Sequence, residues 1–183
     1  MRIKLLTVSC FLAAVFLAVA LQGAWGEADA PDGTRYKVSL RNVSHVLEPK
    51  KPGSAHEDCD YLRGKGRVQL CAPAVEGDAP FSMLCSVFTL MAAALGLALL
   101  SGAVHVISPY RAKSFGAQLA GASFIAALFG TVVAQAAMPR ALAVLEGVPM
   151  QFGGFAFSSA WCAIGLLLFA AGLSTTSIML GHH

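Results

Sequence analysis

Two cysteines are the residues whose type and spacing most plainly indicate chemistry. Cys59 and Cys71 are the only cysteines in the hydrophilic segment 22–80. A disulfide between them closes a loop of about a dozen residues, which stabilises a fold by about 3 kcal/mol in the chain-entropy account. A zinc site is the rival, but His56 and Asp58 nearby make a poor ligand pattern, and no Cys-x-x-Cys motif supports thiol redox chemistry. We therefore predict a structural Cys59–Cys71 disulfide, formed in an oxidising compartment.

The other groups that could do chemistry are scattered charges. One set is Arg140 and Glu146, which are six positions apart. The other set is Asp60 together with His56 and Asp58. Solvated loop charges are the simpler interpretation of both sets. The final pair, His182 and His183, is a weak ligand set at a chain end. We predict no catalytic residue, no metal site and no cofactor, and therefore no enzyme.

Charge is confined to one part of this chain. Of 183 residues, 56% are hydrophobic and 13% are charged, whereas soluble domains average about 25% charged residues. Nine of the ten acidic residues and eight of the thirteen Lys and Arg lie between residues 27 and 78. Acids and bases nearly cancel there, and no basic run is interleaved with aromatics, so we expect no nucleic-acid partner. The composition predicts an integral membrane protein in a lipid bilayer.

Three long apolar runs predict membrane-spanning helices. Phe81–Ile107, Phe115–Met138 and Phe152–Leu180 contain no Asp, Glu, Lys or Arg, and each exceeds the roughly 20 residues that span a bilayer. Only a helix satisfies the backbone groups of such a run inside the segment. A fourth run, Leu5–Leu21, is shorter and precedes the small residues of 22–26. It is either a cleaved signal peptide or a retained first helix.

The positions of basic residues predict the orientation. Arg2 and Lys4 precede the first run, and Arg111 and Lys113 lie in the short turn between the second and third. Such residues mark the cytoplasmic side. The predicted layout is then as follows: first helix or signal peptide 1–21, extracellular or lumenal loop 22–80, helix 81–107, cytoplasmic turn 108–114, helix 115–138, second outer loop 139–151, helix 152–180 and cytoplasmic tail 181–183. The membrane is expected to be the plasma membrane or one of the secretory pathway.

Small residues four apart predict close helix packing, because helices associate in lipid through close backbone approach. The pairs are Ala92 with Gly96, Ala98 with Gly102, Gly116 with Ala120, Ala117 with Gly121, and Ala126 with Gly130, and the last run adds Gly165 and Gly172. Chance in Ala-rich and Gly-rich helices is the alternative. Polar groups within the runs are few, notably His105, Gln118 and Gln135. We expect His105 to be interfacial rather than a proton carrier.

The hydrophilic segment contains two strand-like runs. Arg35–Leu40 and Gly66–Cys71 alternate polar and apolar residues, as half-buried strands do. Two or three strands are marginally stable alone, so they must pack against the helix ends or be held by a disulfide. Asn42 opens an Asn-Val-Ser sequon, a possible glycosylation site on the outer side. The cysteines of the apolar runs, which are Cys10, Cys85 and Cys162, are expected to be free thiols.

The layout resembles the claudin-like tetraspan proteins, a group that includes the amastins. The amastin signature Cys-x-x-Leu-Trp-Gly followed by a second Cys is similar to the stretch 59–71, where Cys59, Leu62, Gly64 and Cys71 match and Arg63 stands in place of Trp. The run 152–168 resembles the fourth helix of both families. The resemblance implies an all-α membrane protein, a left-handed antiparallel four-helix transmembrane bundle with a small extracellular β-sheet in the first outer loop. It also favours retention of the first helix.

Three classes of function remain open. The first is a non-enzymatic tetraspan protein that acts through lateral or cell-surface contacts of its outer loops, with protein partners or self-association in the membrane. The second is an accessory structural subunit of a larger membrane complex or channel. The third, a membrane enzyme or transporter, is disfavoured because paired carboxylates and His clusters are lacking in the apolar runs.

Overall fold

Four long helices dominate the computed structural model, which describes residues 2–29, 35–46, 67–69, 79–107, 113–146 and 149–180. They are α1 (Arg2–Gln22), α3 (Ala79–Ile107), α4 (Lys113–Glu146) and α5 (Phe155–Leu180). Each contains a window that is long and apolar enough to cross a membrane. The fold is therefore that of a multi-pass membrane protein, and the predicted all-helical membrane architecture is confirmed at this level.

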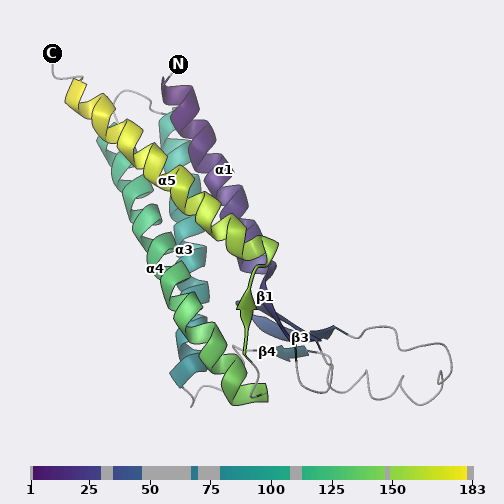
Figure 1. Cartoon of the computed structure of the whole chain (residues 1–183). Helices are drawn as coiled ribbons and strands as arrows, with labels where there is room; N and C mark the ends of the chain where they lie inside the picture. The colour runs from purple at the N-terminus through teal and green to yellow at the C-terminus, as the bar shows by residue number, and fades with distance from the viewer. Residues whose placement is uncertain are drawn as a thin grey trace, which may run out of the picture.

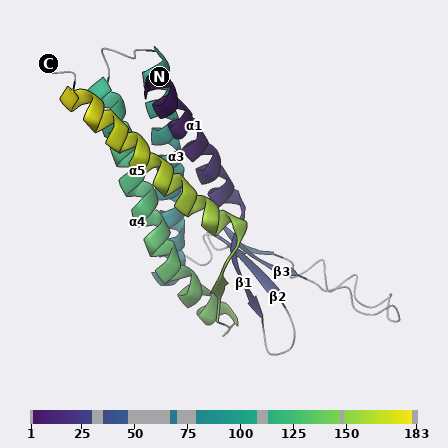
Figure 2. The ribbon, with the colours of Figure 1, turned by 45° about the horizontal axis from the view of Figure 1, so that its top comes forward.

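The helices form an antiparallel bundle with a small sheet at one end. α1 packs against α3 and α5, and α4 packs against the same two helices. Figures 1 and 2 show both chain termini at one end of the bundle and the sheet at the other. The left-handed supercoil stays a prediction.

The bundle interior combines many small residues and a few hydroxyls with larger apolar side chains such as Leu17, Met91 and Leu167. Buried alanines from every helix line it, among them Ala13, Ala94, Ala127 and Ala163. Two hydroxyls bond across helices: Ser123 Oγ of α4 donates to the Ala94 carbonyl of α3 over 2.7 Å, and Ser101 Oγ of α3 donates to the Gly116 carbonyl of α4 over 2.8 Å. Small side chains bring the backbones close enough for these bonds, which have no water to compete with them in lipid.

Large apolar side chains instead cover the outside of the bundle. Val8, Ile125, Phe129 and Leu168 are each more than half exposed. A water-soluble protein of this size does not expose apolar surface on this scale. A bundle with alanines inside and large hydrophobic residues outside therefore fits a bilayer environment.

The sheet is antiparallel and takes strands from both ends of the hydrophilic segment and from beyond α4. Its order is β4-β3-β2-β1-β5. The three longer strands are β1 (Ala24–Asp29), β2 (Arg35–Ser39) and β3 (Asn42–Val46), and the two short edge strands are β4 (Arg67–Gln69) and β5 (Gln151–Phe152). β2 and β4 confirm the two predicted strands. β1, β3 and β5 were not predicted, and β5 joins the second outer segment to the first.

α3 and α4 reach past the ends of α1 and α5. Cys10 of α1 lies beside Ser101 of α3, with 3.6 Å between Sγ and Oγ, so these two residues share a level. α1 ends at Gln22, twelve residues farther along. Because the helices are antiparallel, the same twelve residues along α3, about 18 Å at 1.5 Å per residue, lead to Thr89.

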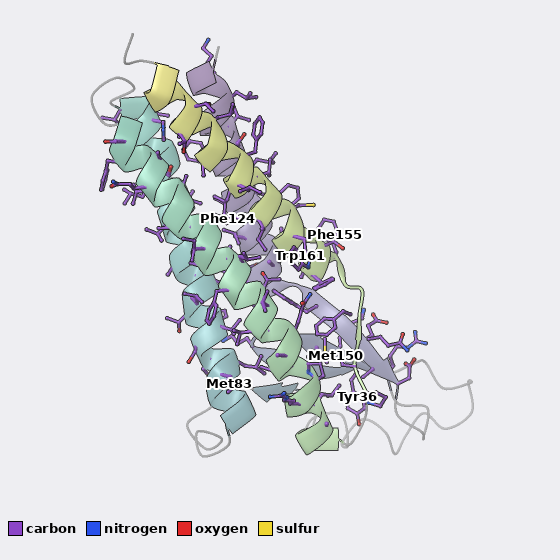
Figure 3. The ribbon with its side chains drawn as sticks, turned by 60° about the vertical axis from the view of Figure 1, so that its left-hand side comes forward. Tyr36, Met83, Phe124, Met150, Phe155 and Trp161 are labelled. Carbon is purple, nitrogen blue, oxygen red and sulfur yellow. The ribbon has the colours of Figure 1, made fainter. Side chains whose placement is uncertain are left out.

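The extra length of the two helices is here called the overhang, defined as residues 79–88 and 134–146. On α4, Thr131 is level with Met91 of α3, because Thr131 Oγ1 lies 4.0 Å from Met91 Sδ. The part of α4 that is level with residues 79–88 of α3 therefore begins near residue 134. Figure 3 shows Met83, in the overhang, at the same end of the molecule as Tyr36 of the sheet and beyond the start of α5. The sheet thus lies in the angle between the overhang and the short helices.

The overhang changes the predicted bounds of the third helix. We expected it to end at Met138, because the run without charged residues was taken to end there. Instead α4 continues through Pro139 to Glu146, so the predicted loop 139–151 is mostly helix. Met138 and Leu142 are buried in the same core as the inward face of the sheet, and this packing offsets the hydrogen bond lost at Pro139, which lacks an N–H.

Two helical glycines provide a test of the bundle interior. A methyl group at Gly116 would overlap the imidazole of the buried His105, whereas one at Gly121 would meet nothing within 4 Å. Gly121→Ala should stabilise the protein by up to about 1 kcal/mol through helix propensity. Gly116→Ala should destabilise it by about 1–3 kcal/mol through overpacking. Thermal unfolding in a mild detergent measures both changes, and equal shifts of the two variants would contradict the packing described.

Candidate functional site

Trp25 occupies the corner where the first helix gives way to the sheet. Its side chain is fully buried, and its indole Nε1 donates a hydrogen bond to the Ala20 carbonyl over 2.6 Å. Carbonyls in the last turn of a helix lack partners within the helix. The backbone N–H of Gly23 satisfies Val19 over 2.8 Å, and the indole satisfies the next carbonyl. Trp25 therefore caps α1 and fixes the direction in which β1 leaves it.

The same residue joins the first helix to the last. The Trp25 carbonyl lies within 3.3–3.4 Å of the N–H groups of Gly153 and Gly154. The Gly154 carbonyl in turn accepts from the N–H groups of Phe157 and Ser158 in the first turn of α5, over 3.0 and 3.3 Å. One backbone unit thus links the end of α1 to the start of α5.

Three glycines make this close approach possible. A methyl group at Gly154 would overlap the Ala24 carbonyl, and one at Gly26 would overlap the Gln151 carbonyl. At Gly23 it would stand 2.7 Å from Cβ of Ala156. In each case the obstacle includes backbone or a short side chain that cannot rotate away. The backbones of β1, β5 and the start of α5 are therefore in direct contact.

Aromatic rings extend the corner along α5. Phe157 lies 6.0 Å from Trp25 in an edge-on arrangement, 5.3 Å from Phe152 of β5 and 6.5 Å from Trp161, measured between ring centroids. Trp161 is 40% exposed. Tryptophan is enriched where a membrane meets water, so we expect that boundary near Trp161 and the start of α5.

The sheet has one buried face and one charged face. Ala28, Tyr36 and Val38 are buried toward the helices, and they share a core with Leu84 and Leu142 of the overhang. The neighbouring residues along β1 and β2 alternate to the opposite face, as strand geometry requires.

That opposite face carries two cross-strand ion pairs. Arg35 Nε lies 3.0 Å from Asp29 Oδ1, and Lys37 Nζ lies 3.9 Å from Glu27 Oε1. All four side chains are exposed, so each pair contributes little to stability. Their arrangement places charges of alternating sign on the face of the sheet directed away from the helices, which is suited to recognition of a charged partner.

A second polar cluster lies near the other end of the bundle. His105 Nδ1 donates to the Ser101 carbonyl over 2.7 Å, and Ser101 Oγ is committed to the Gly116 carbonyl. The imidazole is only 4% exposed, so His105 is buried between α3 and α4, two residues before α3 ends. Its interfacial depth in a membrane stays a prediction. The serine hydroxyl is not directed at the imidazole, so the cluster joins helices and does not form a nucleophile–base pair.

The cysteines depart from the expectation in one respect. Cys10 is a buried free thiol and Cys162 an exposed one, as predicted. Cys85, also expected to be free, is disulfide-bonded, and its partner lies outside the residues that the structure describes. Cys59 and Cys71 fall outside them as well. Because the chain has five cysteines and Cys10 and Cys162 are free, the bond of Cys85 leaves no room for the disulfide proposed between Cys59 and Cys71.

The predicted packing positions divide into two groups. Ala98, Gly102, Gly116, Ala120 and Gly130 are buried in the bundle, and Ala126 is partly buried. At Gly96, Gly121, Gly165 and Gly172 a methyl group would meet nothing within 4 Å, and Ala92 is exposed, so a packing role for these five stays a prediction. Small size alone does not say which face of a helix is buried.

The charged residues considered for catalysis form no cluster among the residues that the structure describes. Arg140 is exposed on the overhang. Glu146 is the last residue of α4, and the structure describes its backbone but not its side chain. His56, Asp58 and Asp60 lie in the segment that the structure leaves undescribed. Within the described ranges no group of three or more His, Cys, Asp or Glu could hold a metal ion. Asn42 of the sequon begins β3.

The residues of the corner were missed by the sequence analysis. The run around Trp25 was considered only as a possible cleavage region, and Gly153 and Gly154 were noted only as part of the last helix. A single tryptophan flanked by glycines directly after an apolar helix is the signal that could have indicated a tight turn.

No known protein family matches this chain, and no curated protein matches it. The claudin-like resemblance therefore rests on layout and on the few residues already named.

Adjacent glycines at the corner form a matched pair for experiment. A methyl group at Gly154 would overlap the Ala24 backbone, whereas one at Gly153 would meet nothing within 4 Å. We expect Gly154→Ala to lower the free energy of unfolding by about 1–3 kcal/mol, because backbone must shift, and Gly153→Ala to change it by less than about 0.5 kcal/mol. Detergent-solubilised thermal unfolding measures both. A tolerated Gly154→Ala would show that the corner is loosely packed.

Proposed function

We propose that this protein is a non-enzymatic tetraspan membrane protein that acts through lateral or cell-surface contacts of its outer segments, in the manner implied by its resemblance to claudin-like proteins. The observation that carries the proposal is the packing of one face of the sheet on the helices, which leaves the other face exposed. One face packs on the overhang and the other directs four exposed charges, those of Glu27, Asp29, Arg35 and Lys37, away from the helices.

The orientation proposed puts the sheet on the extracellular or lumenal side. Lys4 near the start of α1 and Lys113 at the start of α4 lie at the end of the bundle opposite the sheet. Basic residues of short loops mark the cytoplasmic face. The sheet end then faces an oxidising compartment, where the disulfide of Cys85 is stable.

Retention of α1 is part of this proposal. α1 packs against α3 and α5, and Trp25 completes its last turn. A signal peptidase that cut after the small residues following Gln22 would remove a quarter of the bundle. The fold is therefore better explained by a signal anchor than by a cleaved leader.

An accessory role in a larger membrane complex is the second candidate. Gly96 of α3 and Gly165 of α5 have open space beside them, so another helix could approach either face closely. Purification in a gentle detergent separates the two functions. A single large complex of fixed stoichiometry favours the accessory role, whereas variable oligomers or separable partners favour surface contacts.

Site-specific photo-crosslinking in native membranes tests the proposed contact face. A photoreactive amino acid in place of Lys37, on the charged face, should give protein adducts, because this face is directed outward. The same amino acid in place of Val106, which is 61% exposed near the opposite end of α3, is the control for contacts within lipid. Adducts from position 106 and none from position 37 would contradict the proposal.

A further inference from the structure

Gln118 of α4 carries a polar amide on the outside of the bundle. Its side chain is exposed and forms no hydrogen bond with any residue that the structure describes. The exposed hydroxyls of Thr89, Thr175 and Thr176 instead donate to carbonyls of their own helices. A glutamine amide has both N–H donors and a carbonyl acceptor, and at Gln118 all of them are unused.

Contacts between helices give the depth of Gln118. Ser101 of α3 donates to the Gly116 carbonyl of α4 and also lies beside Cys10 of α1, so Gly116 and Cys10 share a level. Gln118 is two residues farther along α4, about 3 Å at 1.5 Å per residue, which makes it level with Leu12. Leu12 lies near the middle of the first charge-free run of the sequence. The amide therefore lies at the depth of the lipid hydrocarbon.

An unpaired amide at this depth is unfavourable, because hydrocarbon contains no hydrogen-bonding group. The headgroups lie beyond Lys113, the first residue of α4, which is five residues from Gln118, about 7.5 Å along the helix. A glutamine side chain does not span that distance, whereas the longer lysine side chain extends to the headgroups. Polar side chains inside a membrane pair with one another. Gln118 therefore needs a hydrogen-bonding partner outside its own bundle.

The surface around Gln118 allows another helix to approach closely. Ala122, one turn farther along α4, is exposed, and so is Ser114, one turn earlier. A methyl group at Gly121 would meet nothing within 4 Å. Residues four apart lie on one face of a helix, so the amide is flanked by small side chains on both sides. Helices associate in lipid through small residues and hydrogen bonds between helices.

We propose that the face of α4 around Gln118 is the contact surface for a second copy of this chain. Copies of a membrane protein share one orientation, so Gln118 of each copy is at the same depth. Two amides can then exchange hydrogen bonds across a two-fold axis normal to the membrane, because each has donors and an acceptor. A different protein would need a polar group at this depth, whereas a second copy supplies one by symmetry. The contact goes beyond the proposed function, because it does not involve the sheet.

Energy transfer between donor-labelled and acceptor-labelled full-length chains in phosphatidylcholine vesicles measures the dimer. We expect the dimer fraction to rise with the protein-to-lipid ratio. Gln118→Leu should raise the dimer dissociation constant about tenfold, because the hydrogen bonds between the helices are lost. Gln118→Asn keeps an amide and should stay within about threefold of the parent protein. The side chain is exposed, so thermal unfolding of the monomeric variants in detergent should match that of the parent.

Gln135→Leu is the matched control, because Gln135 lies in the overhang beyond the membrane boundary and its loss should leave the dimer unchanged. A parent protein that stays monomeric at every protein density, or equal loss from Gln118→Leu and Gln135→Leu, would overturn the proposal. Release of a different protein by Gln118→Leu, with self-association unchanged, would overturn it as well.

Thiol crosslinking locates the contact face. In a Cys162→Ser background, Ala122→Cys should form a disulfide with the second copy when a copper–phenanthroline oxidant accepts the two electrons released by the paired thiols. Val15→Cys, at a similar depth on α1 and 57% exposed in the parent, should not, because it lies on a different helix. Crosslinking of Val15→Cys without crosslinking of Ala122→Cys would contradict the contact through α4.

Discussion

The hydrogen bond from the Trp25 indole to the Ala20 carbonyl is the contact on which the arrangement of this protein depends. A helix that ends at the membrane surface leaves unpaired carbonyls, and a chain that leaves it at random would leave them exposed at a boundary poor in water. The indole satisfies one of these carbonyls with a side chain that is itself fully buried. The strand that follows leads along the overhang, and the sheet packs there on Leu84 and Leu142.

Unequal helix lengths make room for that sheet. α1 and α5 stop near the membrane boundary, while α3 and α4 continue and offer an apolar surface with Leu84, Met138 and Leu142 at its centre. The sheet covers this surface with Tyr36 and Val38. The same helices therefore pack in two environments. In lipid, alanines pack the bundle, and beyond it the two longer helices form a core with the strands on the water-facing side.

The same geometry gives the protein two different surfaces for contact. The face of the sheet opposite the overhang presents fixed charges to water, whereas the helices present large apolar side chains to lipid. A contact protein needs rigid presentation more than it needs reactive groups, and the hydroxyls and imidazole near the other end of the bundle are engaged in joining helices.

Charge-free runs of this length have one structural solution in lipid, so the sequence predicted the helices well. Sequence alternation likewise predicted β2 and β4. The continuation of α4 through Pro139 was not predictable, because local propensity opposes it and only contacts with a distant sheet offset the cost. For the same reason β1 and β5 were missed: Gly26 and Gly154 matter through backbones that are more than a hundred residues apart in the chain. Whether a small residue such as Gly96 or Gly130 faces a helix or lipid depends on helix rotation, which composition does not reveal.

All of this requires that α1 remain attached to Trp25. The most direct measurement is N-terminal sequencing, combined with the intact mass, of the protein purified from its native membrane. The account predicts a chain that still contains residues 2–22 joined to the sheet. A mature protein that begins after Gly23 would lack the carbonyl that Trp25 caps and would contradict the account.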